Sequence, residues 1–196
     1  TLLKKSIVVA SHNKGKIKEF KSLFSRYNVK ITTSSSIGIE EVDETGKTFE
    51  ENALLKAKSI PEGLISLSDD SGLCIKALND EPGILSARFA RNCGGWYEAM
   101  RKLYEKIKIN NLNSTEAKFV SVIALRWEDS SLSIFRGEVS GFISWPPRGE
   151  NGFGYDPFFI PSGYKKTFGQ MNHDKKILID HRYQAFKKIA KLHLKN

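Results

Sequence analysis

The sequence is poor in cysteine, in long apolar runs and in runs of one charge. Its 196 residues hold two cysteines, Cys74 and Cys93, which allow at most one disulfide and whose spacing fits no zinc motif. Two reduced thiols in an intracellular protein are the favoured interpretation. The longest apolar run near the N-terminus covers residues 7–10, fewer than the roughly seven residues of a signal-peptide core. No segment approaches the ~20 apolar residues of a transmembrane helix. We therefore expect a soluble, cytoplasmic protein without a membrane partner.

No run of like charge is longer than two residues, although the net charge is +9. This pattern argues against a basic arm or tail. The charge leaves two alternatives, a surface that binds nucleic acid or a basic pocket for a polyanionic small molecule. Hydrophobic residues make up 40% of the chain, which is enough for a core and excludes a disordered protein. The length fits one compact domain, or one domain with a large lobe.

Strand and helix patterns alternate along the chain, which is typical of an α/β fold. Apolar runs predict short strands at 6–10, 29–33, 64–68 and 73–78. Helical spacing of apolar residues predicts helices after Lys16, at 48–60, at 96–108 and from about Asp180. Residues 117–127 and 131–145 alternate apolar and polar residues, which predicts a long antiparallel hairpin. The sheet is therefore expected to be mixed, with the hairpin forming a second lobe.

A polar turn with the sequence SHNKGK, residues 11–16, follows the first strand and opens the first helix. The N–H groups of such a turn and the helix dipole favour an anion. Lys16 can reach a phosphate, and Asn13 can donate to one. The turn lacks the G-x-x-x-x-G-K-[ST] pattern of a Walker A loop. Taken alone, a plain connection between strand and helix is the simpler alternative.

Three acidic residues are candidate ligands of a cation. Asp69 and Asp70 follow a predicted strand, and adjacent carboxylates repel each other unless a cation is near. Mg²⁺ takes carboxylate oxygens together with substrate phosphates, and Glu44 in a predicted loop can add a third carboxylate. Lys56 lies near the buried face of the predicted helix 48–60 and needs an anionic partner if it is buried. The alternatives are a solvated turn for the acids and a solvent-directed side chain for the lysine.

Two later segments are candidates for contact with a ligand. The sequence GFGYDP at 152–157 flanks an aromatic residue with glycines, so the backbone can approach a ligand and Phe153 can stack on a base. Lys176 and the pair His181–Arg182 are basic, and the pair begins a predicted helix that Asp180 caps, from which its side chains can reach out. The alternatives are core packing for the aromatics and a solvated face for the basic residues.

In this order, the motifs strongly resemble those of the inosine/xanthosine triphosphate pyrophosphatase family, also called the Ham1-like family. The resemblance runs from about Ile7 to Phe186. The motifs that carry it are SHNKGK at 11–16, ETGKTFEENALLKA at 44–57, SDDSGL at 68–73, PGILSARFA at 82–90, GFGYDP at 152–157 and HR at 181–182. The chain departs from the family pattern at Asp180, where serine is usual, in the short stretch 91–95, and in the unusual WPPR at 145–148.

The resemblance implies a single domain over residues 1–196. The implied fold is α/β, an elongated two-lobed structure around a central mixed β-sheet, with a substrate cleft between the lobes, assembled as a homodimer. The implied activity is the Mg²⁺-dependent hydrolysis of ITP, dITP and XTP to the monophosphate and pyrophosphate, with attack at the α-phosphorus. The implied partner is thus a purine nucleoside triphosphate, and no stable nucleic-acid partner is expected.

The resemblance also implies roles for individual residues. Asp70 is the expected proton acceptor, and Glu44, Asp69 and Asp70 are the expected metal ligands. The residues expected to bind substrate are Ser11, His12, Asn13, Lys14, Gly15, Lys16, Lys56, Ser71, Phe153, Gly154, Tyr155, Asp156, Lys176, His181 and Arg182. Of these, His181 and Arg182 are expected to recognise the 6-oxo group that distinguishes hypoxanthine and xanthine from adenine.

Two other functions fit part of the pattern. A Maf-like pyrophosphatase runs the same reaction on modified pyrimidine or methylated nucleotides, but the pair His181–Arg182 and the motif at 152–157 argue against it. A nucleic-acid-binding module would explain the net charge of +9. It would not explain the three acidic residues of the candidate cation site, because clustered carboxylates repel a phosphate backbone in the absence of metal.

Overall fold

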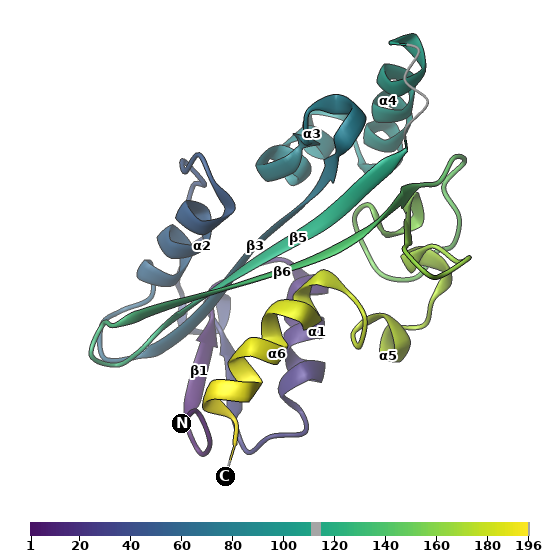
Figure 1. The fold of residues 1–196 in the computed structure, drawn as a ribbon. Coiled ribbons are helices and arrows are strands. Elements are labelled where there is room, and N and C mark those ends of the chain that lie inside the picture. The colour runs from purple at the N-terminus through teal and green to yellow at the C-terminus, as the bar shows by residue number, and fades with distance from the viewer. Residues whose placement is uncertain (111–114, 196) are drawn as a thin grey trace. The chain divides into compact units, whose positions relative to one another are not determined.

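The computed structural model describes residues 1–110 and 115–195. Its strands are β1 (Ser6–Val9), β2 (Lys30–Thr33), β3 (Ile65–Ile75), β4 (Glu81–Pro82), β5 (Glu116–Arg126), β6 (Leu132–Ile143) and β7 (Phe159–Pro161). Its α-helices are α1 (Lys14–Phe24), α2 (Phe49–Lys58), α3 (Ser86–Cys93), α4 (Trp96–Ile109), α5 (His173–Lys176) and α6 (His181–His193). Figure 1 shows β3, β5 and β6 as the long strands of the fold.

The strands form a mixed seven-stranded sheet, as the sequence predicted. The order of its strands is β2-β1-β3-β5-β6-β7, and the short strand β4 pairs with β3. β1 runs parallel to both β2 and β3, whereas β4 pairs with β3 and β7 pairs with β6 in the antiparallel sense. Because β1 and β2 are parallel and α1 connects them, the N-terminal β–loop–α–β unit is confirmed.

The chain divides into two compact units. The first unit comprises Thr1–Asp70, Ser121–Gly137 and Arg182–Asn196, and the second comprises Ser71–Val120 and Glu138–His181. The expectation that the hairpin forms the second lobe is wrong, because its turn end, Ser121–Gly137, belongs to the first unit. β5 is buried along most of its length, whereas β6 alternates buried and more exposed residues, so the pattern predicted the strands but not the unit to which each half belongs.

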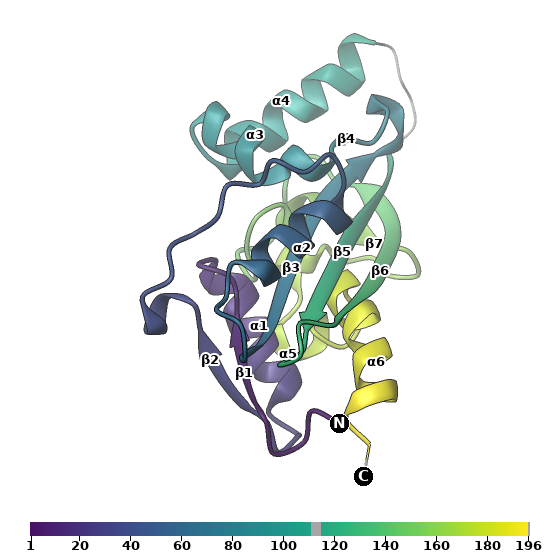
Figure 2. The same cartoon turned by 90° about the vertical axis from the view of Figure 1, so that its left-hand side faces the viewer.

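In the first unit, helices cover both faces of the strands. Figures 1 and 2 show α2 on one face of β3, with α1 and α6 on the other. The aromatic rings of Phe24 in α1 and Phe186 in α6 meet edge to face with centroids 4.9 Å apart. The chain ends are tied together there as well, since the Leu2 N–H donates to the His193 carbonyl at 2.8 Å. Tight packing of two helices on one sheet face buries the apolar side of each.

The polar residues of β3 that face α2 are explained by hydrogen bonds to that helix. The Ser66 hydroxyl donates to the Ala57 carbonyl at 2.8 Å, and the Ser68 hydroxyl donates to the Ala53 carbonyl at 2.5 Å. At the end of α2, the buried guanidinium of Arg126 donates to the Pro61 carbonyl at 2.9 Å. These two hydroxyls and the guanidinium thus have acceptors, which lowers the cost of placing them in the core.

The second unit has its own apolar core. Leu73 and Ile75 of β3 and Phe119 of β5 share it with α4, whose Met100 and Leu103 point inward. Helix α4 matches the predicted helix at 96–108. Helix α3 was not predicted, because its eight residues bury only Ser86 and Ala90 and so show no apolar periodicity.

The two strands predicted at 64–68 and 73–78 are in fact one strand, β3. The polar residues 69–72 between them interrupt the apolar pattern, and a solvated turn was one of two alternatives for them. Instead the strand continues straight through them, because the carboxylates of Asp69 and Asp70 are buried against cations and need no solvent. Gly72 permits this path, since a Cβ at that position would lie 2.1 Å from the Gly83 carbonyl oxygen. A polar run therefore does not mark a turn when each polar group has a partner inside the protein.

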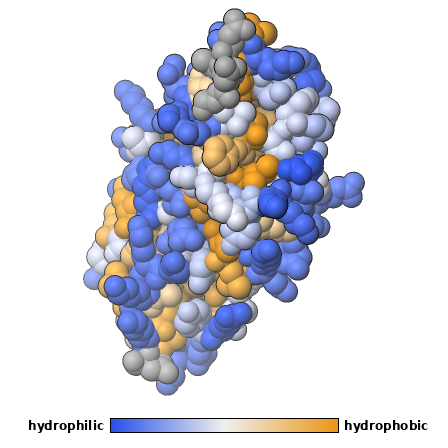
Figure 3. All heavy atoms as spheres, turned by 45° about the vertical axis from the view of Figure 1, so that its right-hand side comes forward, coloured by the Kyte–Doolittle hydropathy of each residue, from blue (hydrophilic) through white to orange (hydrophobic). Residues whose placement is uncertain are grey.

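Figure 3 shows one face on which hydrophilic side chains surround narrower areas of apolar surface. Exposed apolar side chains are ordinary in a folded protein and do not by themselves indicate a partner. Neither Cys74 nor Cys93 is in a disulfide, which agrees with the expectation of two thiols. Within the described residues, no helix has the length and apolar character needed to cross a membrane.

Candidate active site

The loop before α2 is held rigidly, which places Glu44. The Gly46 N–H donates to the buried Asn52 side chain at 2.8 Å, and a Cβ on Gly46 would lie 2.6 Å from that same oxygen. Thr48 caps α2 by accepting from the Glu51 N–H at 3.1 Å, and the Glu51 carboxylate accepts from the Lys47 N–H at 2.6 Å. Thr48 therefore caps α2, and Glu51 ties the preceding residue to the helix start.

Lys56 lies between two carboxylates. It is buried on α2, and its Nζ donates to Glu44 Oε1 at 2.5 Å and to Asp70 Oδ1 at 3.3 Å. Burial lowers the pKa of Lys56, but Asp70 and Glu44 outweigh burial and raise the pKa above its ordinary value. Burial also raises the pKa of Asp70, against the opposing charges of Lys56 and Lys16. The alternative of a solvent-directed lysine is therefore wrong.

Asp69 is the centre of a second group of charges in the first unit. Its Oδ1 accepts from the Ser121 hydroxyl at 2.5 Å, while its Oδ2 accepts from Lys16 at 2.8 Å and from Arg182 at 3.2 Å. Burial disfavours the charged form of Asp69, but Arg182 and Lys16 more than offset it and hold the pKa of that carboxyl well below its usual range. The guanidinium of Arg182 also donates to the buried carboxylate of Glu19.

The polar turn at 11–16 leads into α1, but it is shorter than predicted, because α1 already begins at Lys14. Asn13 caps this helix, accepting from the Lys16 N–H at 3.0 Å, and the Asn13 N–H donates to the Ser11 hydroxyl at 3.1 Å. His12 is exposed, and its Nε2 lies 3.0 Å from the Ile39 carbonyl oxygen. The N–H groups of Lys14 and Gly15 belong to the first turn of the helix, where the dipole favours an anion. The first unit thus brings this turn to the lysine–carboxylate groups through Lys16.

The second unit holds the predicted base-binding segment. Asp156 is buried, and its Oδ2 accepts from the Phe153 N–H at 2.9 Å and from Lys176 at 2.7 Å. The Lys176 ammonium lies 4.8 Å from the centre of the Phe153 ring. Gly152 has a φ of +74°, and a Cβ there would lie 2.0 Å from Asp156 Oδ2, so glycine is required. Asp180 is also close, with its Oδ2 3.9 Å from Lys176 Nζ.

Four other predicted residues lie in the second unit. The Tyr155 hydroxyl donates to the Ser86 carbonyl at 2.8 Å, and Tyr155 is buried. The His181 ring is buried and stacks on Phe119 with centroids 4.7 Å apart. Ser71, half-buried, follows Asp70 in β3, and Gly154 has a φ of +62°. The core-packing alternative therefore holds for Tyr155, whereas Phe153 and Gly154 keep part of their surface exposed.

Arg182 does not share the surroundings of His181. The two residues were predicted to act together, with side chains reaching out past the helix end. Both are buried instead, and the Arg182 guanidinium joins the acidic residues of the first unit while His181 belongs to the second. Neighbouring residues at the start of a helix point in directions about 100° apart, so the separation follows from helical geometry.

Two partners of the acid–base network were missed from the sequence. Glu19 falls on the apolar stripe of α1, three residues after Lys16 and four before the buried Leu23, and that position is the signal of a buried acid. Ser121 interrupts the apolar run of β5, where a lone polar residue indicates an internal partner. Both signals mark burial, but neither names the partner.

Two carboxylates of the first unit, those of Glu44 and Asp70, are suited to bind a divalent cation. Asp70 Oδ2 is buried and has no hydrogen-bond partner among the described residues, and Glu44 shares Lys56 with the same aspartate. Mg²⁺ commonly takes one or two carboxylates and completes its shell with substrate phosphates and water. Within the same described residues, no group of three or more His, Cys, Asp or Glu is placed to hold a metal. Both oxygens of Asp69 already accept hydrogen bonds, and its role as a third ligand stays a prediction.

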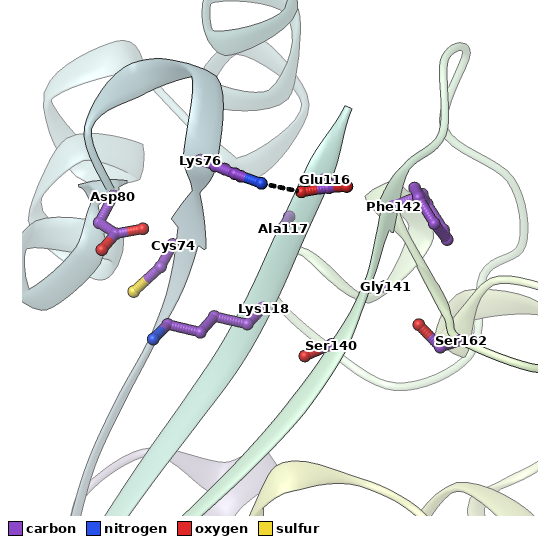
Figure 4. Close-up of a pocket in the computed structure, with 10 residues that line it drawn as sticks. All are labelled: Cys74, Lys76, Asp80, Glu116, Ala117, Lys118, Ser140, Gly141, Phe142 and Ser162. Carbon is purple, nitrogen blue, oxygen red and sulfur yellow. Dashed lines mark hydrogen bonds and ion pairs between the residues drawn. The ribbon is translucent and has the colours of Figure 1, made fainter. Parts of the chain in front are cut away.

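A separate pocket of about 350 Å³ opens on the sheet of the second unit (Figure 4). Its walls come from β3, β5 and β6, and Lys76 and Glu116 form an ion pair of 2.5 Å across it. The residues that line it are Cys74, Lys76, Asp80, Glu116, Ala117, Lys118, Ser140, Gly141, Phe142 and Ser162. None of the predicted site residues is among them, so the pocket is distinct from the candidate active site.

Known proteins with similar sequences match nearly the whole length of this chain. The model of the Ham1 family matches residues 7–192. A protein of Brucella melitensis named dITP/XTP pyrophosphatase is 42% identical, with 96% of this chain and 93% of that protein covered. One of the same name from Agrobacterium fabrum is 43% identical, with 95% and 94% covered.

Solved structures give the same result. A HAM1 protein from Coxiella burnetii matches with a TM-score of 0.85 and 35% identity, covering 95% of this chain and 97% of that one. The Ham1 protein of Staphylococcus aureus matches with a TM-score of 0.79 and 39% identity, covering 95% and 96%. The mixed α/β fold inferred from the motifs is therefore confirmed. By sequence and by structure, this chain belongs to the Ham1 family.

Proposed function

We propose that this protein hydrolyses the non-canonical purine nucleotides ITP, dITP and XTP to the monophosphate and pyrophosphate, and so cleanses the nucleotide pool. One observation carries the proposal, the network in which Asp69 pairs with Lys16 at the start of α1 and with Arg182 of α6, while Asp70 pairs with Lys56 of α2. Three cations balanced by acids suit a ligand that brings both phosphates and a metal. The relatives named dITP/XTP pyrophosphatases, about 40% identical to this chain, support the choice of substrate.

The residues of the first unit carry out the hydrolysis, which transfers the nucleoside phosphoryl group from pyrophosphate to water. Lys16, Lys56 and the N–H groups at the start of α1 bind the triphosphate and stabilise the leaving pyrophosphate. Asp70 orients a water molecule and accepts its proton at Oδ2 as the water oxygen attacks the α-phosphorus. The bond from the α-phosphorus to the bridging oxygen breaks, and pyrophosphate departs. Asp69 keeps Lys16 and Arg182 in place through its Oδ2.

We assign Mg²⁺ to Glu44 and Asp70, with Asp69 as the predicted third ligand. The bound metal would neutralise phosphate charge and assist the ionisation of water. Lys56 already holds these two carboxylates near one another without the metal, because it bridges them. The unsatisfied, buried Oδ2 of Asp70 supports this assignment, since a buried carboxylate oxygen is costly without a partner.

The second unit is assigned to the base. Phe153 offers ring surface for stacking, and the pair Lys176–Asp156 fixes the turn that carries it. The 6-oxo group of hypoxanthine or xanthine accepts a hydrogen bond from His181, whereas the amino group of adenine cannot. A site built on that donor therefore rejects adenine strongly.

Further assignments rest on the family resemblance. We propose that residues 1–196 act as one Ham1-like domain, that two copies form a homodimer, and that the protein works in the cytoplasm with no stable nucleic-acid partner. β3, β5 and β6 run from one compact unit into the other, which supports a single functional domain.

A panel of nucleoside triphosphates tests the proposal. Pyrophosphate release with Mg²⁺ is measured for ITP, dITP, XTP, ATP, GTP and a methylated pyrimidine triphosphate. We expect kcat/KM for ITP and XTP to exceed that for ATP by at least about a hundredfold, because a site that pairs with the 6-oxo group leaves its donor unpaired against adenine. A preference for the pyrimidine would favour the Maf-like alternative. Salt-dependent binding of plain DNA without pyrophosphate release would favour the nucleic-acid-binding alternative.

A further inference from the structure

Trp96, to which the motifs give no role, lies against the segment assigned to the base. It is the first residue of α4 and follows Gly94 and Gly95, whose φ angles are +87° and +141°. A Cβ built on Gly154 would lie 3.7 Å from two carbon atoms of the Trp96 indole, so the six-membered part of the indole covers the Gly154 backbone. Trp96 and Gly154 both belong to the second unit.

The indole of Trp96 has a rigid support on one side. It meets the ring of Tyr155 edge to face, with centroids 5.0 Å apart and an interplanar angle of 85°. Tyr155 is itself immobilised, because it is buried and its hydroxyl donates to the Ser86 carbonyl. A large aromatic side chain held in this way presents its remaining surface without a large loss of conformational entropy on binding.

The remaining surface of Trp96 is open. The side chain is 38% exposed, and Leu85, next to Ser86, is 47% exposed. Phe153 precedes Gly154 and is also partly exposed, with Lys176 against its ring. Gly154, the position at which the backbone can come closest to a ligand, therefore has an accessible aromatic residue before it in the chain and another packed over it. This arrangement fits a flat, apolar ligand rather than a charged one.

We propose that Trp96 contacts the purine ring of the substrate and determines specificity for purine over pyrimidine bases. The inference rests on the proposed function, because it assigns a further contact to the same nucleotide. Stacking of a base on an aromatic side chain is sequence-tolerant and grows with ring area. A bicyclic purine gains more from it than a pyrimidine does, and the phosphate-binding residues of the first unit are left unchanged.

Kinetics of Trp96→Ala test the assignment. We expect KM for ITP to rise about ten- to a hundredfold with kcat within about threefold, because base stacking contributes equally to ground state and transition state. Trp96→Phe restores most of the affinity. Tyr97→Ala is the matched control. Tyr97 is 59% exposed on the same helix, and its ring lies against Trp145 rather than against Tyr155. An unchanged KM for ITP in Trp96→Ala would overturn the proposal.

The fluorescence of Trp96 separates direct contact with the base from a merely structural role, because only direct contact should change the emission when a base binds. The chain has three tryptophans, so Trp127→Phe with Trp145→Phe leaves Trp96 as the sole indole emitter. We expect IMP to quench this emission, and pyrophosphate, which carries no base, to leave it unchanged. Emission unchanged by saturating IMP would refute the contact. Wild-type protein that releases no pyrophosphate from ITP would instead refute the proposed function, and IMP quenching would still decide the role of Trp96.

Discussion

Replacement of Asp70 by asparagine is expected to lower kcat for ITP by about 10²- to 10⁴-fold, the usual contribution of a general base. Asparagine keeps the size of the side chain and one oxygen, but it cannot accept the proton of the attacking water. The nucleotide should still bind, because Lys16 keeps its ion pair with Asp69 and Lys56 keeps its ion pair with Glu44. Steady-state kinetics combined with ITP binding by calorimetry separate the two effects.

Asp129→Asn is the control for Asp70→Asn. Asp129 is an exposed acid of the first unit whose carboxylate is bonded to Ser131 in the hairpin turn. Its replacement removes the same charge from the protein and should leave kcat within about twofold, since surface changes away from a site have small effects. Circular dichroism confirms that both variants are folded. An Asp70→Asn enzyme that kept a tenth or more of the wild-type kcat would exclude Asp70 as the proton acceptor.

Replacement of Arg182 by alanine is expected to lower the free energy of unfolding by about 3–5 kcal/mol. Arg182 is fully buried, and its guanidinium pairs with both Glu19 and Asp69. Alanine would leave two buried carboxylates without this partner, and loss of one member of a buried ion network has that cost. Urea denaturation followed by circular dichroism measures the change.

Two further variants test whether the buried ion network causes the expected loss of unfolding free energy. Arg182→Ala with Glu19→Gln should be less destabilised than the sum of the single changes, because the acid left behind is then neutral. Arg136→Ala, which breaks a half-exposed pair with Glu50, should cost less than about 1 kcal/mol. If Arg182→Ala kept wild-type stability while its ITP-to-ATP ratio of kcat/KM fell at least tenfold, Arg182 would belong to base recognition, as the motifs predicted.

The residues of the first unit show how far a sequence can predict a site. Lys56 was expected near a buried face and in need of an anion, and the structure confirms both statements. Its helix start was predictable because the cap is local, with Thr48 and Glu51 three residues apart. What the sequence could not provide was the identity of partners far along the chain. Ser121 lies 52 residues from Asp69, and no local rule connects them.

The errors share a physical cause. The predicted break in β3 came from the polar residues 69–72, which interrupt the apolar pattern, although buried acids are stable when each has a cationic partner. The expectation that His181 and Arg182 both reach out past the helix end came from their adjacent positions at a helix start, but both are buried. Residues next to each other at a helix start point about 100° apart, so adjacency is a poor guide to a shared partner. In both cases the long-range contact decided the structure.

The position of bond cleavage tests the central claim most directly. ITP is hydrolysed with Mg²⁺ in water enriched in ¹⁸O. The products are separated by chromatography, and the mass of each is measured by mass spectrometry. Attack on the α-phosphorus predicts one heavy oxygen in IMP and none in pyrophosphate, because the water oxygen joins the phosphorus that keeps the nucleoside. Heavy oxygen in pyrophosphate would place the attack at the β-phosphorus. Release of orthophosphate with IDP as the nucleotide product would contradict the account altogether.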